Sequence, residues 1–508
     1  MPITKIADVG AIGMVFDATP QDLPPNAWSN ASNIRFRDGS AERFLGQTQV
    51  FTAPAITPYY ICPYQTTTSK YWIHAGTAAV YADDGTSRTN ITGTAPTGAY
   101  TDRWSGGTLG GVLVMNNGVD VPTYWGGTGT LASLTGWTGT WRAQSIRPFK
   151  NFLIAMSITK GAVKYPHMVK WSHEADPGTI PVSWDETDPT KDAGEQDLAE
   201  TSDLLVDGLA MGSSFIVYKQ RSMYSMTYAG QPFIWNFQRL PGNDGAMARG
   251  CIADTPKGHV VLTSGDVVVH QGQGTQSILT AKMRRWLFTQ MDSTNFANSF
   301  VTTNPWRNEV WVCFPEAGQT ACTLALVWNW VDNTFGTRTL NNVTYGAEGQ
   351  IAYSSLSDWS DTDTWDADTS TWNQDEFAAA QARLLICSTT PVISAVDIGS
   401  TYNGTAITAT LERKHLDFGD PADVKTVRAI YPRIDGTNGT VISVEVGASM
   451  DTNTDPTYSA AQSYTIGSTY KIDTFATGRY ISVRYSSTSA QPWRMRSYDV
   501  DLSARSKF

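Results

Sequence analysis

Pairs of short alternating strands, each closed by turn residues, recur along this chain at similar distances. They begin at Tyr71, Val112, Phe152, Phe215, His259 and Glu309, so successive starts lie 41, 40, 63, 44 and 50 residues apart. A period of about 40–50 residues with strand pairs in each unit indicates a β-propeller, because each small sheet must bury its faces against its neighbours. The spacing predicts a propeller-like body of about six to eight blades.

One interval is longer than the others. It predicts one blade plus an insertion, which we place at residues 164–205, and a further blade is expected between Ile351 and Asp397. The alternative is a large irregular assembly of β-sandwiches, since strand periodicity is a weak signal. Helix signals are scarce, and the two best are at 280–291 and at 375–387, where acidic residues precede an alanine-rich stretch.

The last 120 or so residues differ from the rest, because their alternating strands are longer. Such strands, separated by turn-rich loops, predict a small β-sandwich. The predicted fold class is therefore all-β, with three parts. They are an N-terminal arm and hairpin in residues 1–50, the propeller-like body in 51–390, and the C-terminal sandwich in 391–508.

The composition limits the possible functions. The 508 residues suffice for two or three domains, and 18 Trp, 21 Tyr and 18 Phe can fill their cores. A net charge of −10 argues against a dedicated binder of nucleic acid or acidic membranes. We expect neither a secretory signal nor a membrane-spanning helix. The five cysteines fit neither a disulfide framework nor a zinc site, and we interpret them as buried free thiols of a protein made in a reducing cytoplasm.

Two segments are strongly acidic. Residues 185–203 hold eight acids against one lysine, and residues 358–376 hold seven acids and no base, so each has a net charge of −7. Alternate carboxylates in the second segment are weak candidates for calcium ligands: Asp361, Asp363, Asp366 and Asp368. No frame supplies both the glycine and the glutamate of an EF-hand loop, and Thr369 replaces the glycine of a sialidase Asp-box. A solvated loop held by tryptophans is the favoured interpretation.

No other local pattern defines an active site. The glycine-rich segment 272–277 is predicted to be a hairpin turn, because no βαβ unit surrounds it. His173, beside Glu174 and Asp176, is a weak candidate for a base or metal ligand, and a polar loop histidine is favoured. We predict no enzyme activity and no cofactor. A glycosidase stays open as an alternative, because its paired carboxylates have no local spacing signature.

Residues 26–46 resemble the N-terminal signature of the tail nozzle proteins of short-tailed bacteriophages, also called tail-hub or packaged-DNA-stabilisation proteins. The matching residues are Asn33, Arg35, Phe36, Asp38, Gly39, Arg43 and Gly46. A second group of residues resembles the insertion found in this family: Trp171, Ser172, Trp184, Ala193 and Gly194. Residues 110–125, 222–250 and 478–502 are also similar to the family. The resemblance spans most of the chain, and it depends on the order of several weak motifs.

The resemblance implies a non-enzymatic structural protein of the virion tail, synthesised in the bacterial host cytoplasm. Such proteins lie below the portal and adaptor rings, usually as a hexamer, and extend the channel through which the genome leaves. The implied partners are further copies of the chain, the adaptor ring, and tail parts such as a needle, fibres or spikes. Double-stranded DNA would pass through the channel without specific binding. A negatively charged channel wall fits this role, because each DNA phosphate that a protein neutralises adds to its affinity for DNA.

Two hypotheses concern the residues singled out above. Arg35, Arg37 and Arg43 should pair with carboxylates or backbone oxygens rather than a ligand, and Gly39 should turn the hairpin with a positive φ. The second hypothesis is that at least one of the acidic segments 185–203 and 358–376, the latter with the four aspartates of residues 361–368, lies on the channel side or at the channel mouth, although outward solvated insertions are the simpler interpretation. The rival class is a glycan-binding or glycan-hydrolysing propeller, or a receptor-binding tail protein, because aromatic-rich β surfaces and acidic loops also serve sugar sites.

Overall fold

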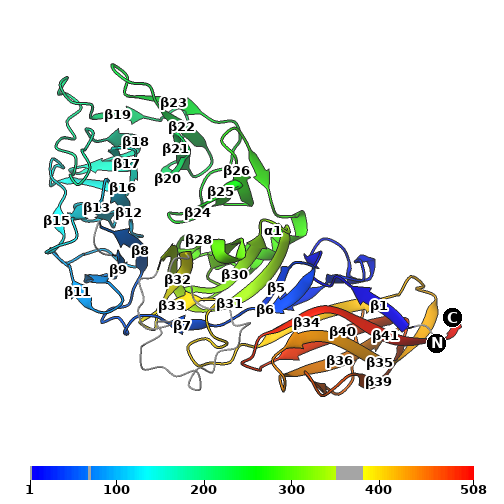
Figure 1. The fold of residues 1–508 in the computed structure, drawn as a ribbon. Coiled ribbons are helices and arrows are strands. Elements are labelled where there is room, and N and C mark those ends of the chain that lie inside the picture. Colours follow the sequence, from blue (N-terminus) through cyan, green and yellow to red (C-terminus); the bar gives the residue numbers. More distant parts are fainter. Residues whose placement is uncertain (1–2, 67–69, 351–381, 508) are drawn as a thin grey trace.

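The computed structural model describes residues 3–66, 70–350 and 382–507. The protein is all-β, with 52% of its residues in strands and 4% in helices. A β-propeller-like body carries a β-sandwich on one side (Figure 1). The fold class predicted from the strand spacing is confirmed.

Five blades are four-stranded antiparallel sheets, each made of consecutive strands. Blade 1 contains β8 (Tyr60–Gln65), β9 (Lys70–Ala75), β10 (Val80–Asp83) and β11 (Arg88–Asn90), and blade 2 contains β12 (Ser105–Leu109), β13 (Val112–Asn116), β14 (Thr123–Trp125) and β15 (Ala132–Ser133). Blade 3 contains β16 (Trp141–Phe149), β17 (Phe152–Lys160), β18 (Val163–Trp171) and β19 (Gly194–Asp197), and blade 4 contains β20 (Leu205–Met211), β21 (Ser214–Lys219), β22 (Met223–Tyr228) and β23 (Trp235–Arg239). Blade 5 contains β24 (Ile252–Thr255), β25 (Gly258–Leu262), β26 (Val267–His270) and β27 (Thr275–Ser277). The first strands of blades 2 to 5 contact one another in succession, so the first strand of each blade lies nearest the axis.

The sixth and seventh blades share one continuous sheet. Its strands are β28 (Phe300–Asn304), β29 (Glu309–Phe314), β30 (Cys322–Asn329), β31 (Thr334–Gln350), β32 (Ala382–Ser388), β33 (Val392–Val396) and β7 (Gln47–Gln49). β31 pairs with β30 up to Val343 and with β32 from Val343 onward, so it ends blade 6 and begins blade 7. β7 pairs with β33 as the fourth strand of blade 7. Within the described residues, an N-terminal strand thus closes a ring of seven blades.

The sandwich uses both ends of the chain. One sheet has the order β39-β35-β41-β6-β5, with β1 also paired to β41, and the other has the order β37-β36-β40-β34-β4, with β38 paired to β36. The N-terminal strands are β1 (Ile3–Ala7), β4 (Asn30–Ser32), β5 (Ile34–Arg37) and β6 (Ser40–Arg43); the others are β34 (Ala409–Leu416), β35 (Asp423–Gly436), β36 (Val441–Ser449), β37 (Thr457–Tyr458), β38 (Gln462–Thr465), β39 (Ile472–Gly478), β40 (Tyr480–Ser487) and β41 (Trp493–Lys507). Most of the segment that the sequence suggested as an N-terminal arm is therefore built into the sandwich.

Short elements connect these sheets. β2 (Gly13–Met14) and β3 (Ala27–Trp28) form a small parallel pair. Three 3₁₀ turns lie at η1 (Pro20–Asp22), η2 (Phe296–Asn298) and η3 (Pro305–Arg307). The helix predicted at 280–291 is confirmed as α1 (Ala281–Gln290), which packs Met283 and Leu287 into the core between blades 5 and 6.

Two sequence predictions need correction. The helix predicted at 375–387 is wrong for residues 382–387, which lie in β32. Residues 384–387 are all buried, and a short continuous apolar run does not distinguish a buried strand from a helix. The insertion placed at 164–205 is also too long, because residues 164–171 belong to β18 and 194–197 to β19. The excursion in blade 3 is the loop of residues 172–193.

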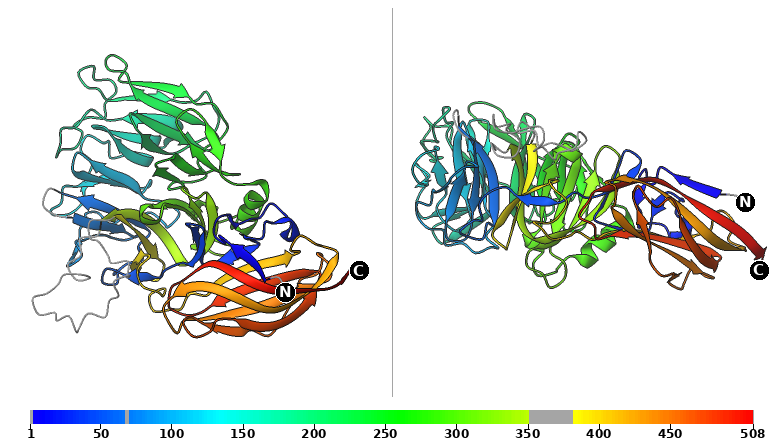
Figure 2. Two further views of the ribbon diagram at one scale, coloured as in Figure 1. Left: turned by 45° about the vertical axis from the view of Figure 1, so that its right-hand side comes forward. Right: turned by 60° about the horizontal axis from the view of Figure 1, so that its bottom comes forward.

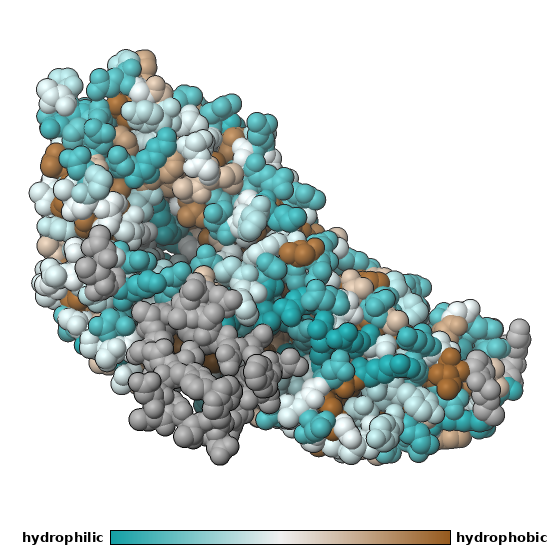
Figure 3. Space-filling model, in the orientation of Figure 1, coloured by the Kyte–Doolittle hydropathy of each residue, from teal (hydrophilic) through white to brown (hydrophobic). Residues whose placement is uncertain are grey.

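The two chain ends lie close together at the far end of the sandwich, away from the propeller (Figure 2). The surface seen in Figure 3 is mostly hydrophilic, with apolar residues scattered among polar ones. Across the described ranges, no helix combines the length and the apolar character required to cross a membrane.

Trp28 tests the contribution of the N-terminal segment to the sandwich. Its side chain is 1% exposed in the sandwich core, and its indole N–H donates to the Val9 carbonyl at 2.5 Å. We expect Trp28→Ala to lower the free energy of unfolding of the sandwich by about 3–5 kcal/mol, measured by urea denaturation. Tyr470→Ala, at a side chain 81% exposed, is the control and should change little. A loss below about 1 kcal/mol for Trp28→Ala would contradict this packing role.

Candidate functional site

The hairpin of the N-terminal signature is formed by β5 and β6, joined by Asp38 and Gly39. Both turn residues are left-handed, with φ of 50° and 69°. Two such residues form the type I′ turn that matches the twist of a tight hairpin. The positive φ predicted at Gly39 is confirmed.

Arg35 on β5 connects the sandwich to the propeller. Its Nε lies 2.7 Å from Glu309 Oε1 at the start of β29, and its Nη2 lies 2.9 Å from Asp397 Oδ2, one residue beyond β33. All three side chains are at most 3% exposed. One guanidinium therefore holds the hairpin, blade 6 and the end of blade 7 together, and we call this cluster the buried joint.

Asp397 is the most heavily bonded carboxylate of the buried joint. Asn304 Nδ2 donates to it at 2.7 Å, and Arg338 Nη1 and Arg307 Nε lie 3.7 and 3.9 Å away. Burial alone would raise the pKa of Asp397, but the charges of the three arginines outweigh it and hold that pKa well below its usual range. Burial raises the pKa of Glu309, which faces Arg35 alone among these arginines. The joint thus keeps Asp397 ionised.

The other signature residues also make structural contacts. Arg43 donates to the carbonyl of Ser400 at 2.9 Å, and Arg37 lies 3.3 Å from Asp38, so the pairing predicted for the arginines is observed. Gly46 approaches Thr401 so closely that an added Cβ would lie 2.3 Å from its carbonyl oxygen.

Asn33 and Phe36 complete the signature. Asn33, with φ of 56°, donates from Nδ2 to the Thr408 carbonyl at 2.8 Å and accepts from the Thr339 N–H at 2.9 Å. Phe36 lies in the sandwich core. The structure therefore brings the signature residues together at the boundary between propeller and sandwich.

The second group of signature residues lies in blade 3. Trp171 donates to the Asp192 carbonyl at 2.8 Å, and Gly194 lies so close to its ring that a Cβ there would be 2.4 Å away. Ser172 Oγ accepts from the Leu153 N–H at 3.0 Å. Trp184 packs edge-on against a neighbouring tryptophan, and Ala193 is buried. These residues fold the 172–193 loop back onto its own blade.

The first acidic segment is partly neutralised by lysines of blades 3 and 4. Lys160 and Lys170 both contact Glu186 and Glu195, and the Lys170 side chain is fully buried. Asp203 lies 3.5 Å from Lys219. The four aspartates of the second segment, Asp361, Asp363, Asp366 and Asp368, lie outside the described residues. Within the described residues, no group of His, Cys, Asp and Glu is arranged to hold a metal ion.

His173 and the segment 272–277 have local structural roles. His173 Nδ1 accepts from the Asp192 N–H at 3.1 Å, which helps to hold the 172–193 loop. Residues 272–277 turn from β26 into β27, and the Gln271 N–H donates to the Gly274 carbonyl, so the predicted hairpin turn is confirmed.

The propeller axis contains a polar network that has no local sequence signature. Asp207 on β20 accepts from Arg147 Nε at 2.9 Å and from Arg147 Nη2 at 2.6 Å, and Ser145 Oγ donates to it at 2.6 Å. The Gly250 N–H, just before β24, also donates to Asp207, at 3.4 Å. Blades 3, 4 and 5 thus share one buried carboxylate.

Two histidines meet one tyrosine between blades 4 and 5. Tyr218 OH lies 2.9 Å from His259 Nδ1 and 3.0 Å from His270 Nδ1. His259 Nε2 must donate to the Ala210 carbonyl at 2.9 Å, so its Nδ1 accepts from Tyr218. His270 Nδ1 must then donate to the tyrosine oxygen. Both rings are fully buried, and burial lowers the pKa of both, to about 4 for His270.

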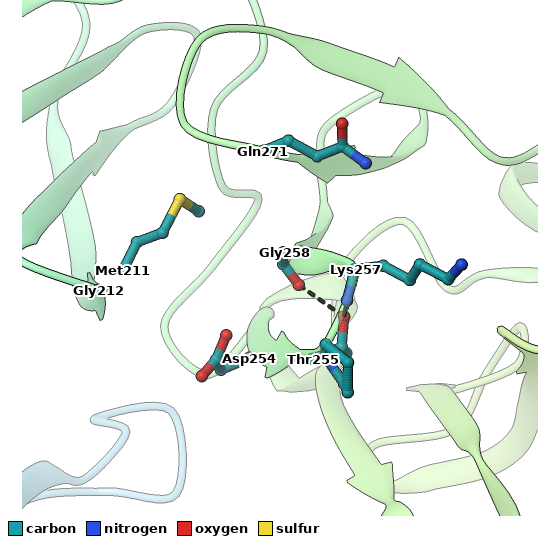
Figure 4. A pocket seen from close by; sticks show the side chains of 8 residues that line it. Met211, Gly212, Asp254, Thr255, Lys257, Gly258 and Gln271 are labelled. Carbon is teal, nitrogen blue, oxygen red and sulfur yellow. Dashed lines mark hydrogen bonds between the residues drawn. The ribbon is translucent and has the colours of Figure 1, made fainter.

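A shallow hollow of about 490 Å³ is lined in part by Gly258 and Gln271, the sequence neighbours of these histidines (Figure 4). Its lining includes Met211 at the end of β20, Asp254 on β24, Lys257 from the β24–β25 turn, and Gln271. The Asp254 carboxylate and the Lys257 ammonium point apart, and Asp254 is 68% exposed. These polar groups do not converge on a common point.

Comparison with known proteins identifies no family. No family model matches the chain, and no curated protein does. Raptor from Chaetomium thermophilum has 9% identity and a TM-score of 0.38; the match covers 70% of this chain and 29% of the Raptor chain. The computationally designed Ika8 protein has 10% identity and a TM-score of 0.38, over 73% of this chain and 96% of the designed one. The chain thus spans less than a third of the Raptor chain.

Asp397→Asn tests the buried joint. The change keeps the shape of the side chain but leaves buried arginines without their carboxylate, which is strongly destabilising. We expect the free energy of unfolding to fall by about 3–5 kcal/mol in urea titrations at pH 7. The control Asp455→Asn, at a side chain 89% exposed, should change it by less than about 0.5 kcal/mol. Equal small effects of both changes would refute the role of the joint.

The paired histidines predict a pH dependence. The folded state holds the pKa of His270 at about 4 against an ordinary value of 6.5, so between these values the unfolded chain binds more protons. Stability should therefore fall as pH drops from about 6.5 to about 4, and His270 should add nothing to this trend above pH 7. His270→Gln cannot titrate and should show a smaller fall in urea midpoint over this window. The same fall in both proteins would contradict the prediction.

Proposed function

We propose that this chain is a non-catalytic structural subunit of a short phage tail, which forms the nozzle that extends the DNA channel below the portal and adaptor. The observation that carries the proposal is the use of the N-terminal signature. Its residues occupy the boundary between propeller and sandwich, and Arg35 is buried there between Glu309 and Asp397. Such a joint is suited to holding two domains at a fixed angle in the wall of a tube.

The filled propeller axis suggests where a DNA channel would lie. The side chains of Arg147 and Asp207 meet there at 2.6 Å, with Ser145 bonded to the same carboxylate. A duplex does not fit through a space occupied by this network. In our proposal the channel therefore runs between subunits of a ring, and each propeller forms part of the wall.

The proposed partners follow from this arrangement. They are further copies of the chain, in a ring that we propose to be a hexamer, together with the adaptor ring and other tail parts such as a needle, fibres or spikes. A net charge of −10 per chain would repel DNA from the wall. The proposed location is the virion tail, and we propose that no catalytic step takes place.

Mass measurement and imaging test the proposal. Purified protein, alone and mixed with the adaptor, should form closed rings with a central opening, because head-to-tail contacts close into rings when the rotation permits. Tails isolated from virions should contain the same number of copies as these rings. A chain that stays monomeric in both preparations, or occurs once per tail, would overturn the proposal. Hydrolysis of a glycan by the monomer would favour the rival class.

A further inference from the structure

Arginines from three blades gather near the starts of β12 and β24 and the end of β16. Arg103 lies just before β12, Arg147 lies within β16, and Arg249 lies just before β24. Arg249 Nη1 donates to the carbonyls of Arg103 and Gln144, both at 2.6 Å, and Arg147 Nη1 donates to the Gly106 carbonyl on β12 at 3.3 Å, so the three arginines lie close together. We call them the axial arginines.

Most of the hydrogen bonds that the axial arginines donate end on neutral carbonyl groups and not on carboxylates. Arg103 donates to the carbonyls of Thr344 and Asn298, each at 3.2 Å. The two bonds of Arg249 also end on carbonyls. Among the residues that the structure describes, a carboxylate partner is found for Arg147 alone, namely Asp207. Carbonyl groups satisfy hydrogen bonds but do not neutralise a buried charge, which is expensive to leave unpaired.

The axis therefore holds an excess of positive charge. Arg147 contacts Asp207 directly, and the charges of Asp207 and Asp102 act on Arg249, so two carboxylates accompany three guanidinium groups. Three positive charges against two negative charges leave an excess of positive charge. Burial lowers the pKa of Arg249 to about 10, the charges of Arg103 and Arg147 also lower it, and the charges of Asp207 and Asp102 oppose this effect.

Arg249 is the axial arginine that can accept a ligand. Both of its hydrogen bonds within the described residues use Nη1, so Nε and Nη2 have no hydrogen-bond acceptor there. Gly118 packs against Nη1, and a Cβ there would come within 2.9 Å of that atom, so glycine at this position leaves room for the guanidinium. The planar fork of a guanidinium matches two oxygens of a phosphate.

We propose that this end of the propeller axis binds a small oxyanion of the phosphate type, held by Nε and Nη2 of Arg249 and stabilised by the charges of Arg103 and Arg147. The site neutralises the positive excess and ties the inner strands of blades 2, 3 and 5 to one ligand. It does not depend on the proposed nozzle function, because its ligand is a free ion and not a partner protein.

Phosphate titration tests the site. Calorimetry of the full chain with inorganic phosphate at pH 7, against sodium chloride of equal ionic strength, should show saturable binding that chloride does not reproduce. Arg249→Gln should weaken the binding about tenfold or more, as expected for the loss of a charge-assisted pair of hydrogen bonds. Arg239→Gln, which removes an exposed arginine at the end of β23, should bind phosphate like the unchanged protein.

Further arms keep the test decisive. If Arg249→Gln does not fold, as judged by circular dichroism, Arg249→Lys keeps the charge without the planar fork and should bind phosphate about threefold to tenfold more weakly. A short duplex oligonucleotide distinguishes a free oxyanion from a DNA backbone phosphate, and we expect no binding of it that depends on Arg249. Absent or non-saturable phosphate binding, equal binding by the Arg249 variants, or duplex binding that requires Arg249 would each overturn the proposal.

Discussion

The carboxylate of Asp397 is the point on which the relation of the two domains depends. It follows the last strand before the chain leaves the propeller, and it is buried against Arg35 from the sandwich and against Arg307 and Arg338 from blade 6. The desolvation of a single carboxylate is offset here by several opposite charges and an amide donor. The interaction joins parts of the chain that are 362 residues apart in sequence. It therefore stabilises the arrangement of the two domains and not one particular strand or helix.

Much of the fold could be predicted from the sequence because each blade is a local unit. The strand pairs that begin at Tyr71, Val112 and Phe152 correspond to the second strands of three successive blades, and the spacing followed from that repeat. The seventh blade was harder to define. Its innermost strand is the second half of β31 and its outermost strand is β7, so no continuous stretch of sequence contains it. Likewise, the apolar run of β32 carries no periodicity that separates a covered strand from a helix.

The candidate sites also differ in how far they could be predicted from the sequence. The Asp38-Gly39 turn was predictable, since its conformation depends on two adjacent residues. The sequence could predict that Arg35 pairs with a carboxylate or a backbone oxygen, but it could not identify the partners. Glu309 and Asp397 are distant in sequence and lie next to Arg35 only in the closed ring. The axial arginines had no signal at all. Arg103, Arg147 and Arg249 are separated by 44 and 102 residues, and only the convergence of inner strands brings them together.

The closure of the ring by β7 has a consequence for the order of events during synthesis. Gln49 emerges from the ribosome long before its partner Ser394, and the two are 345 residues apart. At a translation rate of about 5–20 residues per second, this strand waits roughly 17–70 s without its partner. During that time the nascent chain exposes an unpaired edge in an open arc of blades, the kind of edge that recruits wrong partners. The vulnerable period of this protein is therefore its translation, and it ends only when the last blade has been made.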